Sequence, residues 1–139
     1  MRFMLIVKGT PKSEAGAMPS EKMLNEMTKF NEELSKAGVL VDLSGLQASS
    51  KGARVRFQGG KRTVVDGPFA EAKELVSGYW VLSVKSKEEA IEWARRAPMD
   101  IDGDDAEIEI RPFFELEDFE EFAELDRARK IGEDLAKKK

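Results

Sequence analysis

Ionisable side chains cluster on one short connection near the middle of the chain. Asp66, Glu71, Lys73 and Glu74 fall within nine residues, between two segments with the character of strands. A carboxylate beside a lysine and a second carboxylate can have separated pKa values and can serve as acid and base. Asp66 is therefore the candidate catalytic base. Aspartate before Gly-Pro also forms turns by accepting backbone N–H bonds, and we favour this structural role. Glu71 and Glu74 are more typical of a solvated edge.

Positive charge gathers on the segment that precedes this connection. Arg54 and Arg56 are two residues apart on a predicted strand, so their side chains share a face. They could bind a carboxylate or phosphate, although a solvated or dimer-pairing face is the commoner role. A cleft between the sheet and the Asp66 connection would be lined by Arg54, Asp66, Phe69, Glu71, Lys73, Tyr79 and Trp80.

The composition excludes several kinds of site. The chain has no cysteine and no histidine, which removes thiol nucleophiles, thiolate metal sites and the usual base at neutral pH. The aspartates of residues 100–105 do not fit the EF-hand pattern, because Gly103 is fourth and Arg111 twelfth in that register. The sequence also has no Gly-rich phosphate loop. We therefore expect no metal and no cofactor.

Charge and hydropathy give an expectation for the cellular compartment and for partners. Residues 1–99 carry a net charge of +4 and residues 100–139 one of −8, so the acidic character lies in the tail. A nucleic-acid-binding protein would show a basic excess, so we expect that this protein does not bind nucleic acid. Lys8 interrupts the apolar start of the chain, so neither a signal peptide nor a membrane-spanning helix fits. We expect a cytoplasmic protein that does not bind membranes.

Hydrophobic periodicity predicts alternating strands and helices. The expected helices follow Ser20 and Ser86, with Ser86 and Glu89 forming a capping box, and a tail helix carries an apolar stripe from Phe119 through Phe122 to Leu135. Gly59-Gly60 supplies the turn of a hairpin. The hairpin is expected over residues 53–65, and the other strands span residues 2–8, 39–43, 77–84 and 106–113.

This order predicts an α+β fold of the ferredoxin-like type, a βαββαβ unit with an inserted β-hairpin and an extra C-terminal helix. Both helices would cover one face of an antiparallel sheet. The other face would carry Tyr79 or Trp80, according to register. Because a monomer would leave that apolar face in water, we expect a homodimer.

The motif Asp66-Gly67-Pro68-Phe69, followed by Glu71-x-Lys73-Glu74, resembles the DGPF-domain branch of the YCII-related proteins. The resemblance covers about residues 1–115 and extends to the segments Phe3–Gly9, Gly52–Arg56 and Glu92–Ala94. It implies a ferredoxin-like fold paired into a dimeric α/β barrel, in bacterial proteins that mostly lack an assigned reaction. The His-Asp pair proposed as a catalytic dyad for some relatives cannot operate in a chain without histidine.

Two functional hypotheses follow. In the first, residues 1–116 form a DGPF/YCII-like domain that binds a small molecule near the Asp66–Phe69 loop, with carboxylate acid/base chemistry if it is an enzyme; whether it catalyses a reaction stays open. Residues 117–139 form an amphipathic helical tail. In the second, the protein is a non-catalytic regulatory module. Relatives occur beside sigma factors, and the tail would then be a docking element.

Overall fold

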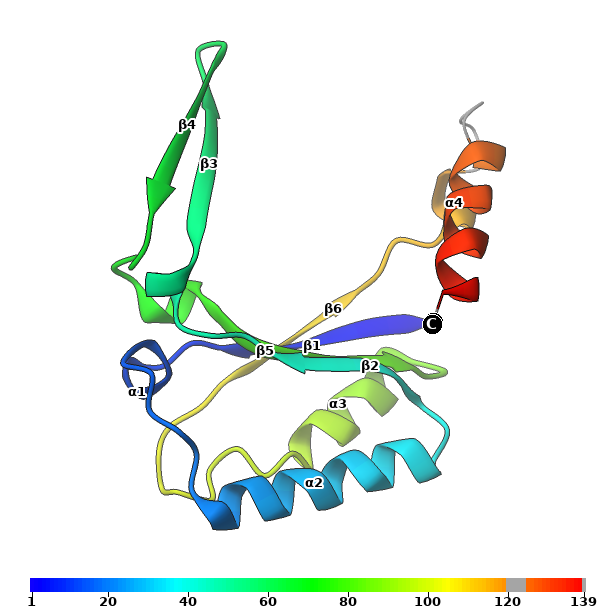
Figure 1. The fold of residues 1–139 in the computed structure, drawn as a ribbon. Coiled ribbons are helices and arrows are strands. Elements are labelled where there is room, and N and C mark those ends of the chain that lie inside the picture. The colour runs from blue at the N-terminus through cyan, green and yellow to red at the C-terminus, as the bar shows by residue number, and fades with distance from the viewer. Residues whose placement is uncertain (120–124, 139) are drawn as a thin grey trace.

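The computed structural model describes residues 1–119 and 125–138, and a four-stranded antiparallel sheet lies at its centre (Figure 1). The strands are β1 (Arg2–Lys8), β2 (Leu40–Gly45), β5 (Val76–Ser83) and β6 (Ile108–Pro112), in the order β2-β5-β1-β6. Helices α2 (Glu21–Lys36) and α3 (Lys87–Arg95) lie together below the sheet in Figure 1. This strand order and helix placement match the predicted ferredoxin-like arrangement.

The two covering helices begin at the serines that the sequence indicates. The Ser20 hydroxyl accepts the Met23 N–H at 3.0 Å, and the Ser86 hydroxyl accepts the Glu89 N–H at 3.2 Å. The predicted capping box at α3 is wrong in one detail. Glu89 accepts the N–H of Lys85 at 2.9 Å, one residue before the N-cap, because its side chain reaches past Ser86.

The core lies between the helices and the lower face of the sheet. Phe3, Leu5 and Leu82 are almost completely buried there, as is Leu34 of α2. The Phe30 ring meets the Trp80 ring edge-on, with centroids 5.5 Å apart. Trp80 therefore faces the helices, and Tyr79, the preceding residue on β5, points to the opposite face. The register pairs Tyr79 with Ile6 and places both on that face.

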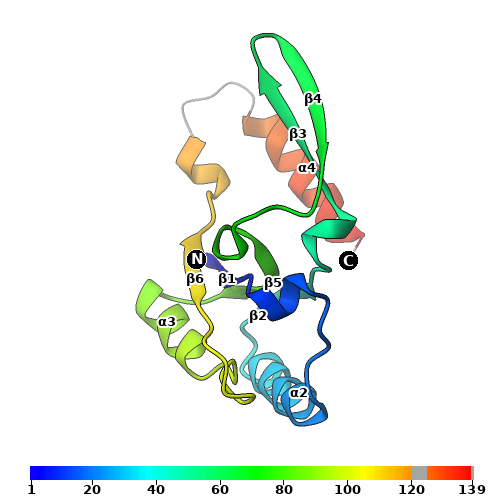
Figure 2. The same ribbon diagram turned by 90° about the vertical axis from the view of Figure 1, so that its left-hand side faces the viewer.

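The inserted hairpin stands away from the central sheet. Strands β3 (Ala53–Gln58) and β4 (Lys61–Asp66) pair only with each other, and Gly59 and Gly60 both have positive φ in the turn, at 59° and 77°. The hairpin rises above the sheet, on the side opposite α2 and α3 (Figures 1 and 2). On one of its faces Val55, Phe57 and Val64 are 54%, 67% and 65% exposed.

Short helical turns complete the chain. They are α1 (Pro11–Glu14) and three 3-10 turns, Ser49–Lys51, Ala72–Glu74 and Leu116–Phe119. The C-terminal helix α4 (Leu125–Lys137) exposes Ile131 and Leu135, whereas Phe119, the first residue of the predicted stripe, lies in the last of these 3-10 turns. Of the predicted stripe, Phe122 lies outside the described residues. No helix in the described part of the chain is long and apolar enough to cross a membrane.

Candidate functional site

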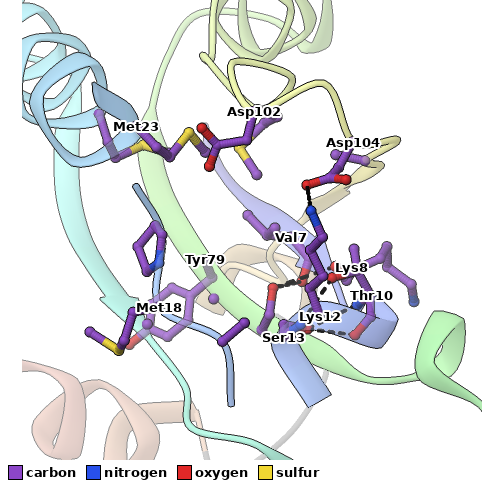
Figure 3. A pocket seen from close by; sticks show the side chains of 18 of the residues that line it. Val7, Lys8, Thr10, Lys12, Ser13, Met18, Met23, Tyr79, Asp102 and Asp104 are labelled. Carbon is purple, nitrogen blue, oxygen red and sulfur yellow. Dashed lines mark hydrogen bonds and ion pairs between the residues drawn. The ribbon is translucent and has the colours of Figure 1, made fainter. Parts of the chain in front are cut away.

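A cavity of about 600 Å³ opens at one end of the central sheet (Figure 3). Its walls come from the start of α2, the chain between β1 and α2, the ends of β2 and β5, and the loop after α3. The volume falls within the range of pockets that hold small organic molecules.

Methionine side chains give the cavity its character. Met18, Met23, Met27 and Met99 all line it, beside Tyr79 and Trp80. Thioether side chains are flexible and polarisable, so they adapt to ligands of different shape and make favourable contacts with aromatic rings. These residues favour a largely apolar ligand.

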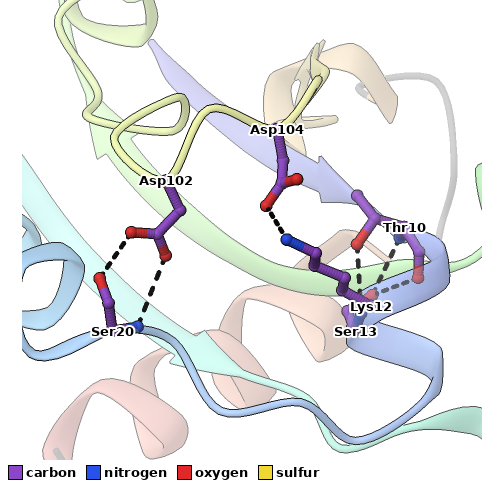
Figure 4. A network of polar contacts seen from close by, with 6 residues as sticks. All are labelled: Thr10, Lys12, Ser13, Ser20, Asp102 and Asp104. Carbon is purple, nitrogen blue, oxygen red and sulfur yellow. Dashed lines mark hydrogen bonds and ion pairs between the residues drawn. The ribbon is translucent and has the colours of Figure 1, made fainter.

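Two pairs of residues, Lys12–Asp104 and Ser20–Asp102, hold the loop after α3 across the cavity (Figure 4). The Lys12 ammonium donates to Asp104 at 2.8 Å, and the Ser20 hydroxyl donates to Asp102 at 2.6 Å. The hydrogen bond to Asp104 and its negative charge raise the pKa of Lys12 above its usual value. Asp102 and Asp104 belong to the aspartate run that does not fit the EF-hand pattern. In the structure Asp104 joins the loop to α1, and Asp102 joins it to the N-cap of α2.

The aromatic residues of β5 are fixed by polar partners. The indole N–H of Trp80 donates to Asn31 Oδ1 at 2.8 Å, and both residues line the cavity. The Tyr79 hydroxyl donates to Asp42 Oδ2 at 3.3 Å. The amide nitrogen of Asn31 carries two N–H donors that a ligand in the cavity could accept.

A second, more open hollow lies at the base of the hairpin and contains two other predicted site residues. Arg54 and Phe69 line it, and the Arg54 guanidinium stacks over the Phe69 ring at 3.8 Å from the centroid. Lys51 and Glu14 also contribute to its walls. The structure therefore separates the predicted ligand-binding residues: Tyr79 and Trp80 line the first cavity, whereas Arg54 and Phe69 line the second.

The Asp66–Phe69 motif is held in place by Ser49. The Phe69 N–H donates to the Ser49 hydroxyl oxygen at 3.0 Å, and that hydroxyl donates to Glu14. Glu14 also accepts the Ser49 N–H at 2.9 Å, and these two bonds lower the pKa of its carboxyl. A Cβ on Gly67 would lie 1.8 Å from the Ser49 carbonyl oxygen, so only glycine fits there. The Gly67-Pro68 peptide bond is cis.

The charged residues of the motif point to solvent. Asp66, Glu71 and Lys73 are exposed and do not line either of these two hollows. Asp66 makes no side-chain hydrogen bond or ion pair with the described residues, so the predicted turn, in which its carboxylate accepts backbone N–H bonds, is absent from that part of the chain. The backbone of Asp66 instead pairs with Ala53 at the end of the hairpin.

Two of the charged groups at the first cavity, Lys12 and Asp104, are paired with each other. No cluster of three metal-ligating side chains occurs among the described residues. Sequence reasoning missed this cavity because Met23 and Met27 fit the apolar stripe of a core-facing helix. The available signal was the presence of four of the six methionines near the start of α2 and in the loop after α3.

Comparison with known proteins identifies the family. An uncharacterised protein of Rhizobium meliloti (strain 1021) is 31% identical over 75 residues, which is 54% of this chain and 60% of that protein. The chain thus spans less than two thirds of that relative. The family model for the YCII-related domain matches residues 1–114, from β1 to just beyond β6. This chain therefore belongs to the YCII-related domain family.

Proposed function

We propose that this protein is a homodimer that binds a small, largely apolar molecule in the methionine-lined cavity. The observation that carries the proposal is the cavity itself: about 600 Å³, walled by four methionines and two aromatic residues, and bridged by two pairs of polar residues. Asn31 supplies a polar group for orientation. The Asp66–Phe69 motif supports membership of the DGPF branch, and its role in this account is structural.

Support for the homodimer comes from the upper face of the sheet. Met4, Ile6 and Tyr79 lie on that face and are only partly buried in the single chain. Burial of such surface stabilises association by about 25 cal/mol per Å². Light scattering at several protein concentrations tests this part: a dimer mass is expected, and a monomer mass throughout contradicts it.

The ligand site is tested with a thermal-shift screen of neutral aromatic and aliphatic fragments. Met23→Trp places a large side chain at the cavity wall, and Lys22→Trp adds the same side chain at an exposed neighbouring position. Fragments that raise the Tm of the wild type should do so for Lys22→Trp and fail for Met23→Trp.

The same screen on Asp66→Ala separates the two candidate locations. Hits that survive in Asp66→Ala and disappear in Met23→Trp support the cavity. The reverse pattern would move the site to the Asp66–Phe69 loop and overturn the proposal. Fragments that stabilise all variants equally would also contradict it.

A further inference from the structure

The hairpin β3-β4 exposes three large apolar side chains, Val55, Phe57 and Val64, to water. Val55 and Val64 are directly opposed, and Phe57 lies on the same face beneath the Arg62 guanidinium, 4.9 Å from the ring centroid. An isolated two-stranded hairpin is at best marginally stable, because one strand pair leaves its faces uncovered. A second surface that covered this apolar face would therefore stabilise the hairpin.

The hairpin also carries a strong positive charge. Residues 51–65 contain five Lys/Arg and no Asp/Glu. Of these cations, Arg62 shares the apolar face, while Arg54 is stacked on Phe69 at the base. A partner surface must combine apolar groups with negative charge.

A segment with these properties follows β6. Residues 114–119 contain Phe114, Glu115, Glu117, Asp118 and Phe119 and no Lys/Arg. Phe114 is 75% exposed, and its ring lies 5.0 Å from that of Phe119. Glu115 is paired with Arg2, whereas Glu117 is exposed and makes no ion pair with the described residues. We call residues 114–119 the acidic-aromatic segment.

The positions of the hairpin and the acidic-aromatic segment in the fold would allow each to contact the other element of a second copy. Both stand on the upper side of the sheet, at its opposite ends (Figures 1 and 2). Consider a second copy stacked on that face, with a twofold axis parallel to the sheet and perpendicular to the line joining the two ends. The hairpin of each copy then meets the acidic-aromatic segment of the other, twice per dimer.

We propose that the hairpin of one copy docks on the acidic-aromatic segment of a second copy of this chain. The inference rests on the homodimer of the proposed function and specifies how its two arms pair. Arg62 would face Glu117 and Asp118, and Phe57, on the same face of the hairpin, would pack against Phe114. The segment lies largely outside the part of the chain that the family model matches, so this contact would be a property of this chain's own C-terminal extension.

The absence of cysteine makes a direct cross-linking test possible. Val64→Cys and Glu117→Cys, each introduced alone, are mixed and oxidised. A disulfide-linked heterodimer is expected from the mixture and from neither variant alone, because the symmetry keeps like positions apart. Lys22→Cys on the exposed side of α2 is the control and should give no cross-link with either variant.

Charge reversal provides a second readout that does not depend on cysteine placement. Arg62→Glu and Glu117→Arg should each raise the dimer dissociation constant by roughly 2- to 30-fold, since twofold symmetry counts each exposed ion pair twice. The double variant should recover most of that loss. Circular dichroism confirms that each variant is folded.

The outcomes distinguish the two proposals. A dimer that shows no cross-link above the Lys22→Cys control, and no rescue in the double variant, overturns the arm pairing and leaves the homodimer intact. A monomer at every concentration overturns the homodimer and the pairing with it. A Glu117→Arg variant that loses capture of another protein while its dimerisation is unchanged would also overturn the pairing, in favour of a docking tail.

Discussion

Glu14 and Ser49, 35 residues apart, form the contact that joins α1 to the base of the hairpin. The carboxylate of Glu14 accepts both the Ser49 N–H, at 2.9 Å, and the Ser49 hydroxyl. The same hydroxyl oxygen accepts the N–H of Phe69. One serine therefore connects three segments, and the Asp66–Phe69 motif is one of them.

Removal of that serine should change the response of the protein to acid. The pKa of Glu14 is lowered in the folded state, so its stabilising contribution is present above its usual value of 4.5 and is lost as pH falls through the folded pKa. Ser49→Ala should have a lower Tm than the wild type at pH 7, and the difference should shrink below pH 4.5. Ser50→Ala, at the exposed neighbour, is the control. A Tm difference that is the same at pH 7 and pH 3.5 would contradict this coupling.

Gly67 should not tolerate a side chain. Gly67→Ala brings a Cβ within 1.8 Å of a backbone oxygen and should cost about 1–3 kcal/mol of unfolding free energy, as overpacking does. Gly52→Ala is a matched control, because its Cβ would lie at an ordinary 3.6 Å from the same Ser49 oxygen. Urea unfolding measures both. Equal losses in the two variants would show that the close approach at Gly67 has no energetic consequence.

The Trp80–Asn31 hydrogen bond should contribute measurably to stability. Asn31→Ala leaves the indole N–H of Trp80, a residue only 5% exposed, without its partner, which costs about 1–3 kcal/mol. Asn25→Ala removes the same side chain from an exposed position of α2 and should change stability by less than about 0.5 kcal/mol. If both variants unfold at the same urea concentration, the cavity wall takes no support from this bond.

A core substitution sets the scale for these effects. Leu82 is completely buried between β1, β2 and α2, and Leu82→Ala should destabilise by about 2–5 kcal/mol. Leu46→Ala, at a 53% exposed position, should cost far less. Thermal unfolding followed by circular dichroism checks the pair.

The sequence predicts the element order because the residues that begin helices and form turns act locally. Ser20 and Ser86 cap their helices, and Gly59-Gly60 turns the hairpin, through contacts within a few residues. The cavity and the Ser49 joint depend on residues up to about 90 positions apart, such as Lys12 and Asp104. No local periodicity reveals such pairs, so the sequence pattern points to the charged residues of the motif and not to Met18, Met23 or Glu14.

The most direct test of the account follows the methionine methyl groups by NMR in ¹³C-methyl-methionine-labelled protein. The chain has six methionines, of which Met18, Met23, Met27 and Met99 line the cavity, while Met1 and Met4 do not and serve as internal controls. On titration with indole as a neutral apolar probe, the four cavity signals should shift and saturate with one common dissociation constant. Shifts confined to Met1 and Met4, or no saturable shift of the four cavity signals, would contradict ligand binding in this cavity.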